Sequence, residues 1–433
     1  MTPRQELTAE APLFESHEGS GPALFAGLFF GFHLLVTVLA VWLFGTTPQA
    51  GIMADLTLTF LVLALIAFAC LGSQPIQRLD LLRSAPSRWA LLFLLFSACS
   101  LAWTVAASVP AAVAFWSAMA ADVGIVLLLL RAYAPQHVIA SLFRGFVYGA
   151  CAVAVIAWFF PKPTDNRLGY EGLLSTNAIG FLCAFAFFLV QYLVLVRKEK
   201  HTLIMILLGI TLLRSLSKTT IIAFLLSQTL LLAASRSIPR RTKILVTIAA
   251  LLIVLLFSSL LLSYVDDYVT TGSQAETLSG RLGIWTLMFT EAIERPWIGH
   301  GFHSVWNVIP PYGPDQFEIR HAHNELLQQF YAYGAVGIVL FFGIYTSLLL
   351  QIRRLPRGVL RTFLFSFLVF ILIRGLADTD AFDLSLPLWT ILLFSALMQR
   401  VTAQAPSLAL QTQQSPREKT PQAPCNFPDS LTS

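Results

Sequence analysis

The chain has 433 residues, of which 56% are hydrophobic and only 12% are charged, and its mean hydropathy is +0.73. Repeated apolar runs of about 20 residues with almost no charge exclude a soluble globular protein and indicate an integral membrane protein. Four of the five cysteines lie inside apolar runs, which excludes a disulfide or zinc–cysteine framework, and the net charge of +5 is less informative than the positions of the charges.

About twelve apolar segments follow one another along the chain. We therefore predict an all-α fold with about 12 transmembrane helices, at residues 23–44, 52–71, 89–108, 111–130, 137–160, 173–196, 202–215, 218–235, 243–264, 325–350, 359–377 and 384–400. This divides the chain into a cytoplasmic N-terminal tail (1–22), membrane helices 1–9 (23–264), one large extracytoplasmic loop (265–324), membrane helices 10–12 (325–401) and a cytoplasmic tail (402–433). The last tail is rich in Pro, Gln and Ser and is predicted to be disordered.

Two of the apolar segments are predicted to cross the membrane twice. Residues 202–235 have Lys and Arg at both flanks, and the positive-inside bias places both flanks in the cytoplasm. The chain must then turn near Arg214–Lys218. Residues 89–130 follow the same pattern, and Pro110 is available to break the helix.

With both termini inside, most Lys and Arg residues fall on the cytoplasmic side, and eight cations oppose this bias. A plain interfacial anchor or a salt-bridge partner is the alternative for each, and it suits Lys162 and Arg295 best. The other six lie beside Gly, Asn, Ser or Thr at the ends of spans, which suits recognition of an anion. They are Arg167, Arg214, Lys218, Arg281, Arg320 and Arg374.

Two of these basic groups stand in recognisable local patterns. Arg214 and Lys218 are four residues apart, so in a helical turn they would share one face and could bind a phosphate-bearing lipid head group. Cations that reach out to the lipid surface are the alternative. Arg167 ends an outer loop ahead of Ser175 and Asn177, which suit a helix cap, and a cap would leave Arg167 able to reach a ligand.

The large loop opens with Ser279-Gly280-Arg281, ahead of an amphipathic stretch at residues 282–293. Trp285, Met288 and Phe289 suit a helix lying on the bilayer surface, and Arg281 near its N-terminus would form an anion site. The next motif, Pro296 to Gly301, is a turn whose glycines permit close approach of the backbone to a ligand. As turn chemistry alone this motif is unspecific.

The loop closes with His321-Ala322-His323-Asn324, the candidate for proton transfer. Histidine titrates near neutrality, which suits activation of a sugar hydroxyl. Two histidines at this spacing could chelate a metal, but the sequence offers no third ligand at a recognisable spacing, so we predict neither a metal nor a cofactor. Asp378, with Asp380 and Asp383, follows Arg374 and could orient Arg374 or His323, bind an acceptor, or only cap a helix.

The motifs of residues 160–340 resemble those of the O-antigen ligase/polymerase superfamily of bacterial envelope proteins. Each motif alone is weak, and their order and spacing together are fairly specific. The chain departs from the family at Tyr333, where members often carry an acidic residue before the glycine matched to Gly334. The matching features are Arg167–Gly169 with Asn177, Ser217-Lys218-Thr219, Ser279-Gly280-Arg281 with Trp285, Pro296–Gly299 with Gly301, and His323-Asn324 with Leu327 and Gly334–Gly337.

The resemblance implies an inverting, metal-independent membrane glycosyltransferase of the GT-C-like class. Such an enzyme takes a glycan from undecaprenyl diphosphate on the periplasmic face of the bacterial inner membrane and joins it to lipid A–core or another acceptor. Carried onto this chain, His323 would be the catalytic base, with His321 as the residue that could replace it, and Asn324 and Arg374 would contact substrate. The diphosphate would be held by Arg167, Arg214, Lys218, Arg281 and Arg320. Of these, Arg281 would also take part in catalysis.

Several alternatives remain open at this stage. A polymerase of the same superfamily would differ only in its acceptor, which nothing in the sequence identifies. A multi-span transporter of an anionic solute and a non-catalytic partner of a polysaccharide assembly complex are the other two. The sequence shows no basic–aromatic face for nucleic acid, so membrane lipids and lipid-linked glycans are the expected partners.

Overall fold

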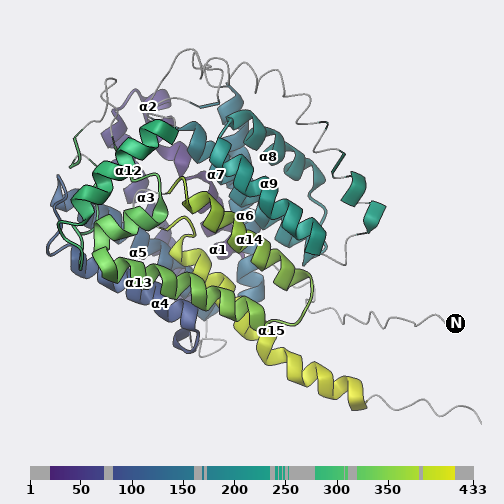
Figure 1. Cartoon of the computed structure of the whole chain (residues 1–433). Coiled ribbons are helices and arrows are strands. Elements are labelled where there is room, and N and C mark those ends of the chain that lie inside the picture. The colour runs from purple at the N-terminus through teal and green to yellow at the C-terminus, as the bar shows by residue number, and fades with distance from the viewer. Residues whose placement is uncertain are drawn as a thin grey trace, which may run out of the picture.

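The computed structural model describes residues 20–72, 81–159, 168–169, 173–234, 278–306, 308–310, 319–379 and 384–414, with a few isolated residues between 239 and 252. Within these residues every regular element is a helix (Figure 1). The elements are α1 (Gly21–Phe32), α2 (Leu34–Phe44), α3 (Pro48–Leu71), η1 (Leu81–Arg83), α4 (Ala85–Ser100), α5 (Val109–Ala132), α6 (Pro135–Phe159), α7 (Thr176–Leu195), α8 (Thr202–Ser215), α9 (Lys218–Ala234), α12 (Leu278–Ala292), α13 (Glu325–Arg354), α14 (Val359–Gly375) and α15 (Leu388–Gln414).

Five of the described helices, α3, α5, α6, α7 and α13, are long and apolar enough to cross a membrane. The pair α1 and α2 forms a sixth candidate, although it bends by 67° at His33, and α4, α8 and α9 are apolar but shorter. Each predicted span except 243–264 coincides with one or two helices, and most of 243–264 lies outside the described residues. The structure therefore supports a helical multi-pass membrane protein, and the count of twelve spans stays a prediction.

The predicted reversal within residues 202–235 is confirmed. Gly180 of α7 lies against Ser215 and Ser217, and farther along α7 Phe187 contacts Gly209 of α8, so α8 runs antiparallel to α7. Gln191 of α7 exchanges two hydrogen bonds of 2.6 and 3.0 Å with Gln228 of α9, so α9 runs parallel to α7. The chain thus changes direction at residues 216–217.

Two predicted boundaries are wrong. The span predicted at 89–108 ends as a helix at Ser100, because the residues that follow bond to a distant loop: Val105 N–H donates to the His300 carbonyl over 3.0 Å. Pro110 does lie at the break, inside the first turn of α5. The tail predicted to be disordered from residue 402 is helical as far as Gln414, where Ala, Leu and Gln favour helix although Pro406 does not, and residues 415–433 lie outside the described residues.

Helix α1 packs closely on α6 through paired glycines. Gly27 and Gly31 of α1 face Gly145 and Gly149 of α6, and a Cβ at any of the four would overlap the backbone of the other helix. Small residues four apart let helix backbones approach, which is a common packing mode in membranes. This contact fixes the position of α1 just before its bend at His33.

Arg144, which the sequence places inside a span, is paired in the structure. Its guanidinium donates to both carboxylate oxygens of Glu199, over 3.0 and 2.6 Å, and His201 lies 2.9 Å from the same carboxylate. Glu199 and His201 belong to the connection between α7 and α8. A bidentate partner explains how this cation is tolerated in an apolar helix.

Helix α13 is broken at Gly334, where φ is 61° and ψ is −150°. The segment 296–301 lies against the break: Gly301 N–H donates to the Ala332 carbonyl over 2.8 Å, and Ala335 N–H donates to the Pro296 carbonyl over 2.7 Å. Non-helical backbone at membrane depth is tolerated only where its polar groups are satisfied, and this segment satisfies them. The predicted span 325–350 is therefore two helical pieces, the first of which carries the histidine loop.

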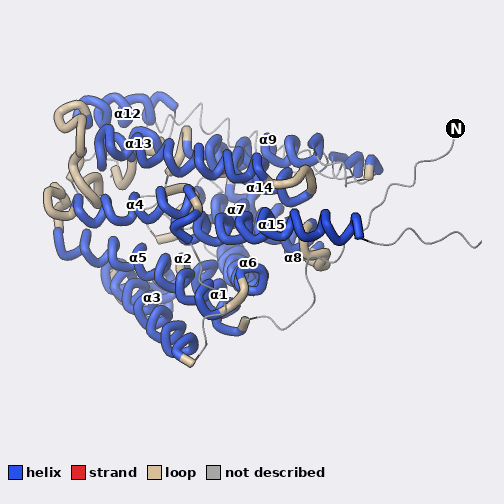
Figure 2. The backbone as a smooth tube through the Cα atoms, turned by 90° about the horizontal axis from the view of Figure 1, so that it is seen from below, coloured by secondary structure: helices blue, strands red, loops and turns tan. Residues whose placement is uncertain are grey.

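Figure 2 shows α12 and α13 at one edge of the bundle and α3 at the opposite edge. Ile284, Met288 and Ala292 of α12 are buried against α13 and the loop beside it. Phe289 is exposed, as a helix at the bilayer surface would require, but Met288 faces the protein instead. The predicted amphipathic helix exists, and its apolar face is divided between the protein and the outside.

Candidate functional site

The histidine loop, the end of α14 and the connection to α15 bring four side chains together. His323 Nδ1 lies 3.5 Å and His321 Nε2 lies 3.7 Å from Asp378 Oδ1, and the two imidazole centres are 4.2 Å apart. Arg374 donates to the other carboxylate oxygen of Asp378 over 3.3 Å and to Ser385 Oγ over 3.4 Å. His321, His323, Arg374 and Asp378, separated by as many as 57 residues, form one cluster, which we call the histidine–aspartate cluster.

The electrostatics of the histidine–aspartate cluster suit proton transfer. Burial lowers the pKa of the His323 imidazole below its usual 6.5, the neighbouring His321 lowers it further, and Asp378 raises it only in part. Burial alone would raise the pKa of Asp378, but Arg374 and the two histidines hold it well below its usual range. The pair therefore presents an ionised carboxylate beside a neutral imidazole near pH 7, which is the state that a general base requires.

His323 also has an unusual backbone. Its φ is 51°, in the left-handed region that few non-glycine residues adopt. The loop is held by Gln328, whose side-chain oxygen accepts from Ala322 N–H over 2.8 Å, and by the cap of α13. Strained conformations of this kind persist where the surrounding structure imposes them, and they gather at functional sites.

Glu325 was missed by the sequence analysis as a member of the site. It is 2% exposed, and its Oε1 accepts from Tyr345 Oη–H over 3.0 Å and from Ser385 N–H over 3.1 Å. It thereby ties the first residue of α13 to the connection that carries Asp378. The signal was a carboxylate at the first position of an apolar span, directly after the histidine loop.

Arg281 reaches the same region from α12. Its Nη1 donates to Thr219 Oγ1 over 3.3 Å, and its charge acts on the His323 imidazole. Arg281 stands in the fourth position of α12 and not ahead of the helix. The structure therefore places Arg281 against the start of α9 and within electrostatic reach of His323, and the anion site itself stays a prediction.

The prediction that Arg214 and Lys218 share one helical face is wrong. Helix α8 ends at Ser215, Leu216 adopts a left-handed conformation with φ of 55°, and Lys218 begins α9. Arg214 is buried, at 6% exposure, whereas Lys218 is exposed. The two cations still lie at the same reversal of the chain, but the Arg214 side chain is buried within the protein and the Lys218 side chain is exposed at its surface.

Arg320 lies beside a row of rings. Its Cζ lies 5.3 Å from the centre of Trp306, the His303 ring is 6.0 Å from Trp306, and His303 stacks on Phe115 at 5.2 Å. Cation–π contact of this kind holds a guanidinium near an aromatic face. Arg320 immediately precedes His321, so this row adjoins the histidine–aspartate cluster.

The remaining predicted residues have structural roles or fall outside the described part. The Asn324 side chain accepts from Leu327 N–H over 3.0 Å and donates to the Leu376 carbonyl over 2.9 Å. These bonds indicate that Asn324 positions α13, and they favour this role over the predicted contact with substrate. Ser175 caps α7 as expected, accepting from Ala178 N–H over 3.1 Å. Arg167 lies outside the described residues, as do Asp380 and Asp383.

The glycines of residues 296–301 approach protein and not ligand. A Cβ at Gly299 would overlap the backbone of Ala332 and Tyr333, and one at Gly301 would lie 2.5 Å from Thr104 Cα. His300 is buried, stacks on Tyr331 at 4.4 Å and donates from Nδ1 to the Tyr331 carbonyl over 3.3 Å. This motif builds the support for α13, and the expectation of a ligand contact there is wrong.

The structure places Asp378 beside His321 and His323, as a third possible metal ligand that the sequence alone did not reveal. Ligand atoms of His321, His323 and Asp378 lie within 4.8 Å of one another, so among the described residues these three could hold a metal ion. Two histidines and a carboxylate suit zinc. Arg374, however, already pairs with the Asp378 carboxylate and would compete with a divalent cation.

One comparison with known proteins bears on the chain. Residues 203–342 match the model of a protein family described as O-Antigen ligase. The matched segment contains Arg214, Lys218, Arg281 and the histidine loop, whereas Arg374 and Asp378 lie beyond it. No curated protein matches the chain.

Proposed function

Because residues 203–342 match the O-antigen ligase family, we propose that this chain is a glycosyltransferase of the O-antigen ligase/polymerase superfamily, of the GT-C-like class, acting at the periplasmic face of the bacterial inner membrane. It transfers a glycan from undecaprenyl diphosphate to lipid A–core or another envelope acceptor. The observation that carries the proposal is the histidine–aspartate cluster with Arg281 beside it, in a bundle whose helices include five long and apolar enough to cross a membrane. A polymerase, whose acceptor is a second lipid-linked glycan, is the alternative within the same superfamily.

In the proposed reaction His323 acts as the general base. Its Nδ1 faces Asp378, so Nε2 is the atom that accepts the proton of the acceptor hydroxyl. The hydroxyl oxygen then bonds to the anomeric carbon as the bond from that carbon to the phosphate oxygen breaks, and the carrier diphosphate leaves. A single displacement of this kind inverts the anomeric configuration.

The departing diphosphate gains negative charge, and fixed cations stabilise it without reorganisation. Arg281 is placed best for this role, because it lies near His323 and is held by Thr219 at the start of α9. Lys218, which opens the same helix, and Arg214, at the end of α8, would complete the anion site, with Arg167 and Arg320 as further contacts. Arg374 pairs with Asp378 and orients it, which makes Arg374 a positioning residue in this scheme.

The decisive experiment compares two histidine variants with a surface control. We expect His323→Ala to lower transfer by about 10²–10⁴-fold, the usual contribution of a general base, while the protein still accumulates in the membrane. His321→Ala should retain more activity, because His321 is the more exposed imidazole and lies farther from Asp378. Arg353→Ala, at the far end of α13, should leave transfer unchanged, and normal surface glycan in the His323 variant would remove His323 from the mechanism.

Ligase and polymerase differ in their product. Purified protein is supplied with a lipid-linked donor and either lipid A–core or a second lipid-linked glycan, and the product is identified by mass. Placement of residues 265–324 is tested separately by accessibility of introduced cysteines to a membrane-impermeant reagent. Labelling of this loop only from the cytoplasmic side would refute the proposed enzyme.

A further inference from the structure

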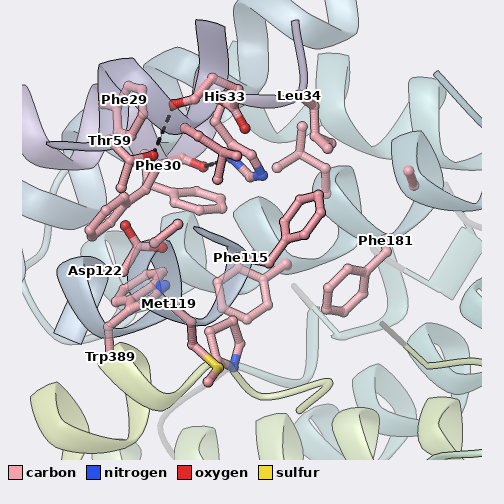
Figure 3. A pocket seen from close by; sticks show the side chains of 18 residues that line it. Phe29, Phe30, His33, Leu34, Thr59, Phe115, Met119, Asp122, Phe181 and Trp389 are labelled. Carbon is pink, nitrogen blue, oxygen red and sulfur yellow. Dashed lines mark hydrogen bonds between the residues drawn. The ribbon is translucent and has the colours of Figure 1, made fainter. Parts of the chain in front are cut away.

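A cavity of about 470 Å³ lies among α1, α3, α5, α6, α7 and the start of α15 (Figure 3). Its walls are mainly apolar and rich in aromatic rings, which include Phe30, Phe115, Phe181 and Trp389. This volume is within the range of sites that bind small molecules, roughly 300–1,000 Å³. None of the roles assigned above uses this cavity.

One part of the cavity is polar. His33, Asp55, Thr59 and Asp122 contribute to its lining, and His33 marks the 67° bend between α1 and α2. Asp55 Oδ1 is buried without a hydrogen-bond partner among the described residues. Ionisable side chains and a broken helix at membrane depth are costly, and together they indicate a place where a polar ligand binds.

The opposite part of the cavity shares its wall with the histidine–aspartate cluster. In Figure 3 Phe181 lies across the cavity from Thr59 and Asp122. The Arg374 guanidinium, which belongs to the histidine–aspartate cluster, lies 3.7 Å from the centre of the Phe181 ring. Phe115 stacks on His303, in the row of rings that leads to Arg320 and His321.

The residues that line the cavity indicate which class of ligand it can bind. No Lys or Arg is among the residues that line the cavity, and His33 Nδ1 already bonds the Phe30 carbonyl over 2.9 Å, so the lining does not favour an anionic group. The two carboxylates accept hydrogen bonds, and the aromatic walls offer flat apolar faces. A polyprenyl chain has no donor and would leave Asp55 Oδ1 buried against hydrocarbon without a hydrogen-bond partner, which is costly.

We propose that this cavity binds a sugar ring of the acceptor glycan, with its hydroxyls donating to Asp55 and Asp122 and its apolar face against Phe115 and Phe181. The inference rests on the proposed function and specifies it further: the diphosphate of the donor lies on the cationic side of the Phe181 wall, and the acceptor sugar lies on the acidic side. The nucleophilic hydroxyl of the acceptor then extends past Phe181 toward His323. The acceptor class is an uncharged or amino-substituted sugar.

The test measures initial transfer rates in full-length protein while donor and acceptor are varied independently, with lipid A–core and a lipid-linked glycan as the two acceptors. We expect Asp55→Asn and Asp122→Asn each to raise the acceptor KM about 10-fold, the loss of one charge-assisted hydrogen bond, with the donor KM unchanged. Thr59→Val should raise the acceptor KM by a smaller factor. Its matched control is Thr57→Val, which loses the same kind of bond to a backbone carbonyl on an exposed part of α3.

A second pair of variants covers the case in which an aspartate variant does not fold. Ala118→Phe should fill the cavity and raise the acceptor KM, whereas Val113→Phe, on an exposed position of the same helix, should not. A raised donor KM in the cavity variants would assign the cavity to the carrier chain and overturn the inference, as would unchanged values of both KM. Absence of transfer by the wild-type protein with every donor and acceptor would instead refute the proposed function.

Discussion

The backbone N–H of Ser385 donates to Glu325 Oε1 over 3.1 Å, although the two residues are 60 positions apart. Through this bond the first residue of α13 holds the connection between α14 and α15, on which Asp378 lies. Tyr345, which lies beyond the break of α13 at Gly334, donates to the same oxygen. The geometry of the histidine–aspartate cluster thus depends on a carboxylate that itself contacts neither histidine in the described hydrogen-bond network.

We predict that Glu325→Ala lowers the free energy of unfolding by about 2–4 kcal/mol, because it leaves the Tyr345 hydroxyl and the Ser385 N–H buried without an acceptor. Glu325→Gln keeps an acceptor oxygen and should restore most of this stability. Thermal unfolding in detergent measures both variants. Tyr345→Phe is the matched control, since it removes one of the two bonds, and equal stability of Glu325→Ala and wild type would contradict the role of Glu325.

The acid limb of the pH–rate profile should report on His323. Because burial lowers the pKa of His323, the imidazole stays neutral down to a pH below 6.5, and transfer should fall only below that pH. Asp378 raises the pKa of His323, so Asp378→Asn should move the acid limb to still lower pH and also reduce the maximal rate. A limb that stays in place in Asp378→Asn would show that the carboxylate does not act on the base.

Chelation tests the metal alternative that the fold raises. His321, His323 and Asp378 could bind zinc, but Arg374 neutralises the carboxylate, and the proposed mechanism needs no metal. We therefore expect purified protein to keep its full transfer rate after treatment with EDTA. Loss of activity that added zinc restores, together with one bound zinc per chain by elemental analysis, would show that the histidine–aspartate cluster is a metal site and would contradict the general-base mechanism.

Local patterns in the sequence predicted the helices well, because long apolar runs and flanking charges are properties of neighbouring residues. The reversal at residues 216–217 was found from Lys and Arg at its flanks, and the histidine loop from its motif. Such signals need no knowledge of how distant segments pack. They fail at boundaries such as Ser100, where the helix ends because a loop 200 residues away supplies the hydrogen bonds.

The composition of the site could be predicted only in part, since most of its contacts join distant segments. Asp378 was one of three acidic residues near Arg374, and nothing in the sequence distinguishes the one that faces the histidines. The common face of Arg214 and Lys218 failed because a left-handed Leu216 intervenes. The glycines of residues 296–301 were assigned to a ligand because a close approach of backbone to backbone leaves the same sequence signal.

The break in α13 gives the last prediction. Gly334 has φ of 61° and ψ of −150°, a combination that essentially only glycine adopts, and a Cβ there would lie 2.5 Å from the Trp297 carbonyl carbon. Gly334→Ala should therefore cost about 3 kcal/mol or more of stability, from backbone strain together with displacement of segment 296–301. The measurement is the yield of monodisperse protein and its thermal unfolding in detergent.

Substitutions at two other glycines serve as controls, because they separate backbone strain from steric overlap in the loss of stability expected for Gly334→Ala. Gly45 has φ of 62° but open space around it, so Gly45→Ala should cost only the strain of the left-handed backbone, about 1–2 kcal/mol. Gly358 has extended backbone and open space, so Gly358→Ala should cost only the preference of an N-cap for Gly over Ala, about 0.5–1 kcal/mol. If Gly334→Ala unfolds at the same temperature as Gly358→Ala, the segment 296–301 can yield without loss, and the support of the histidine loop must come from Glu325 and the cap of α13 alone.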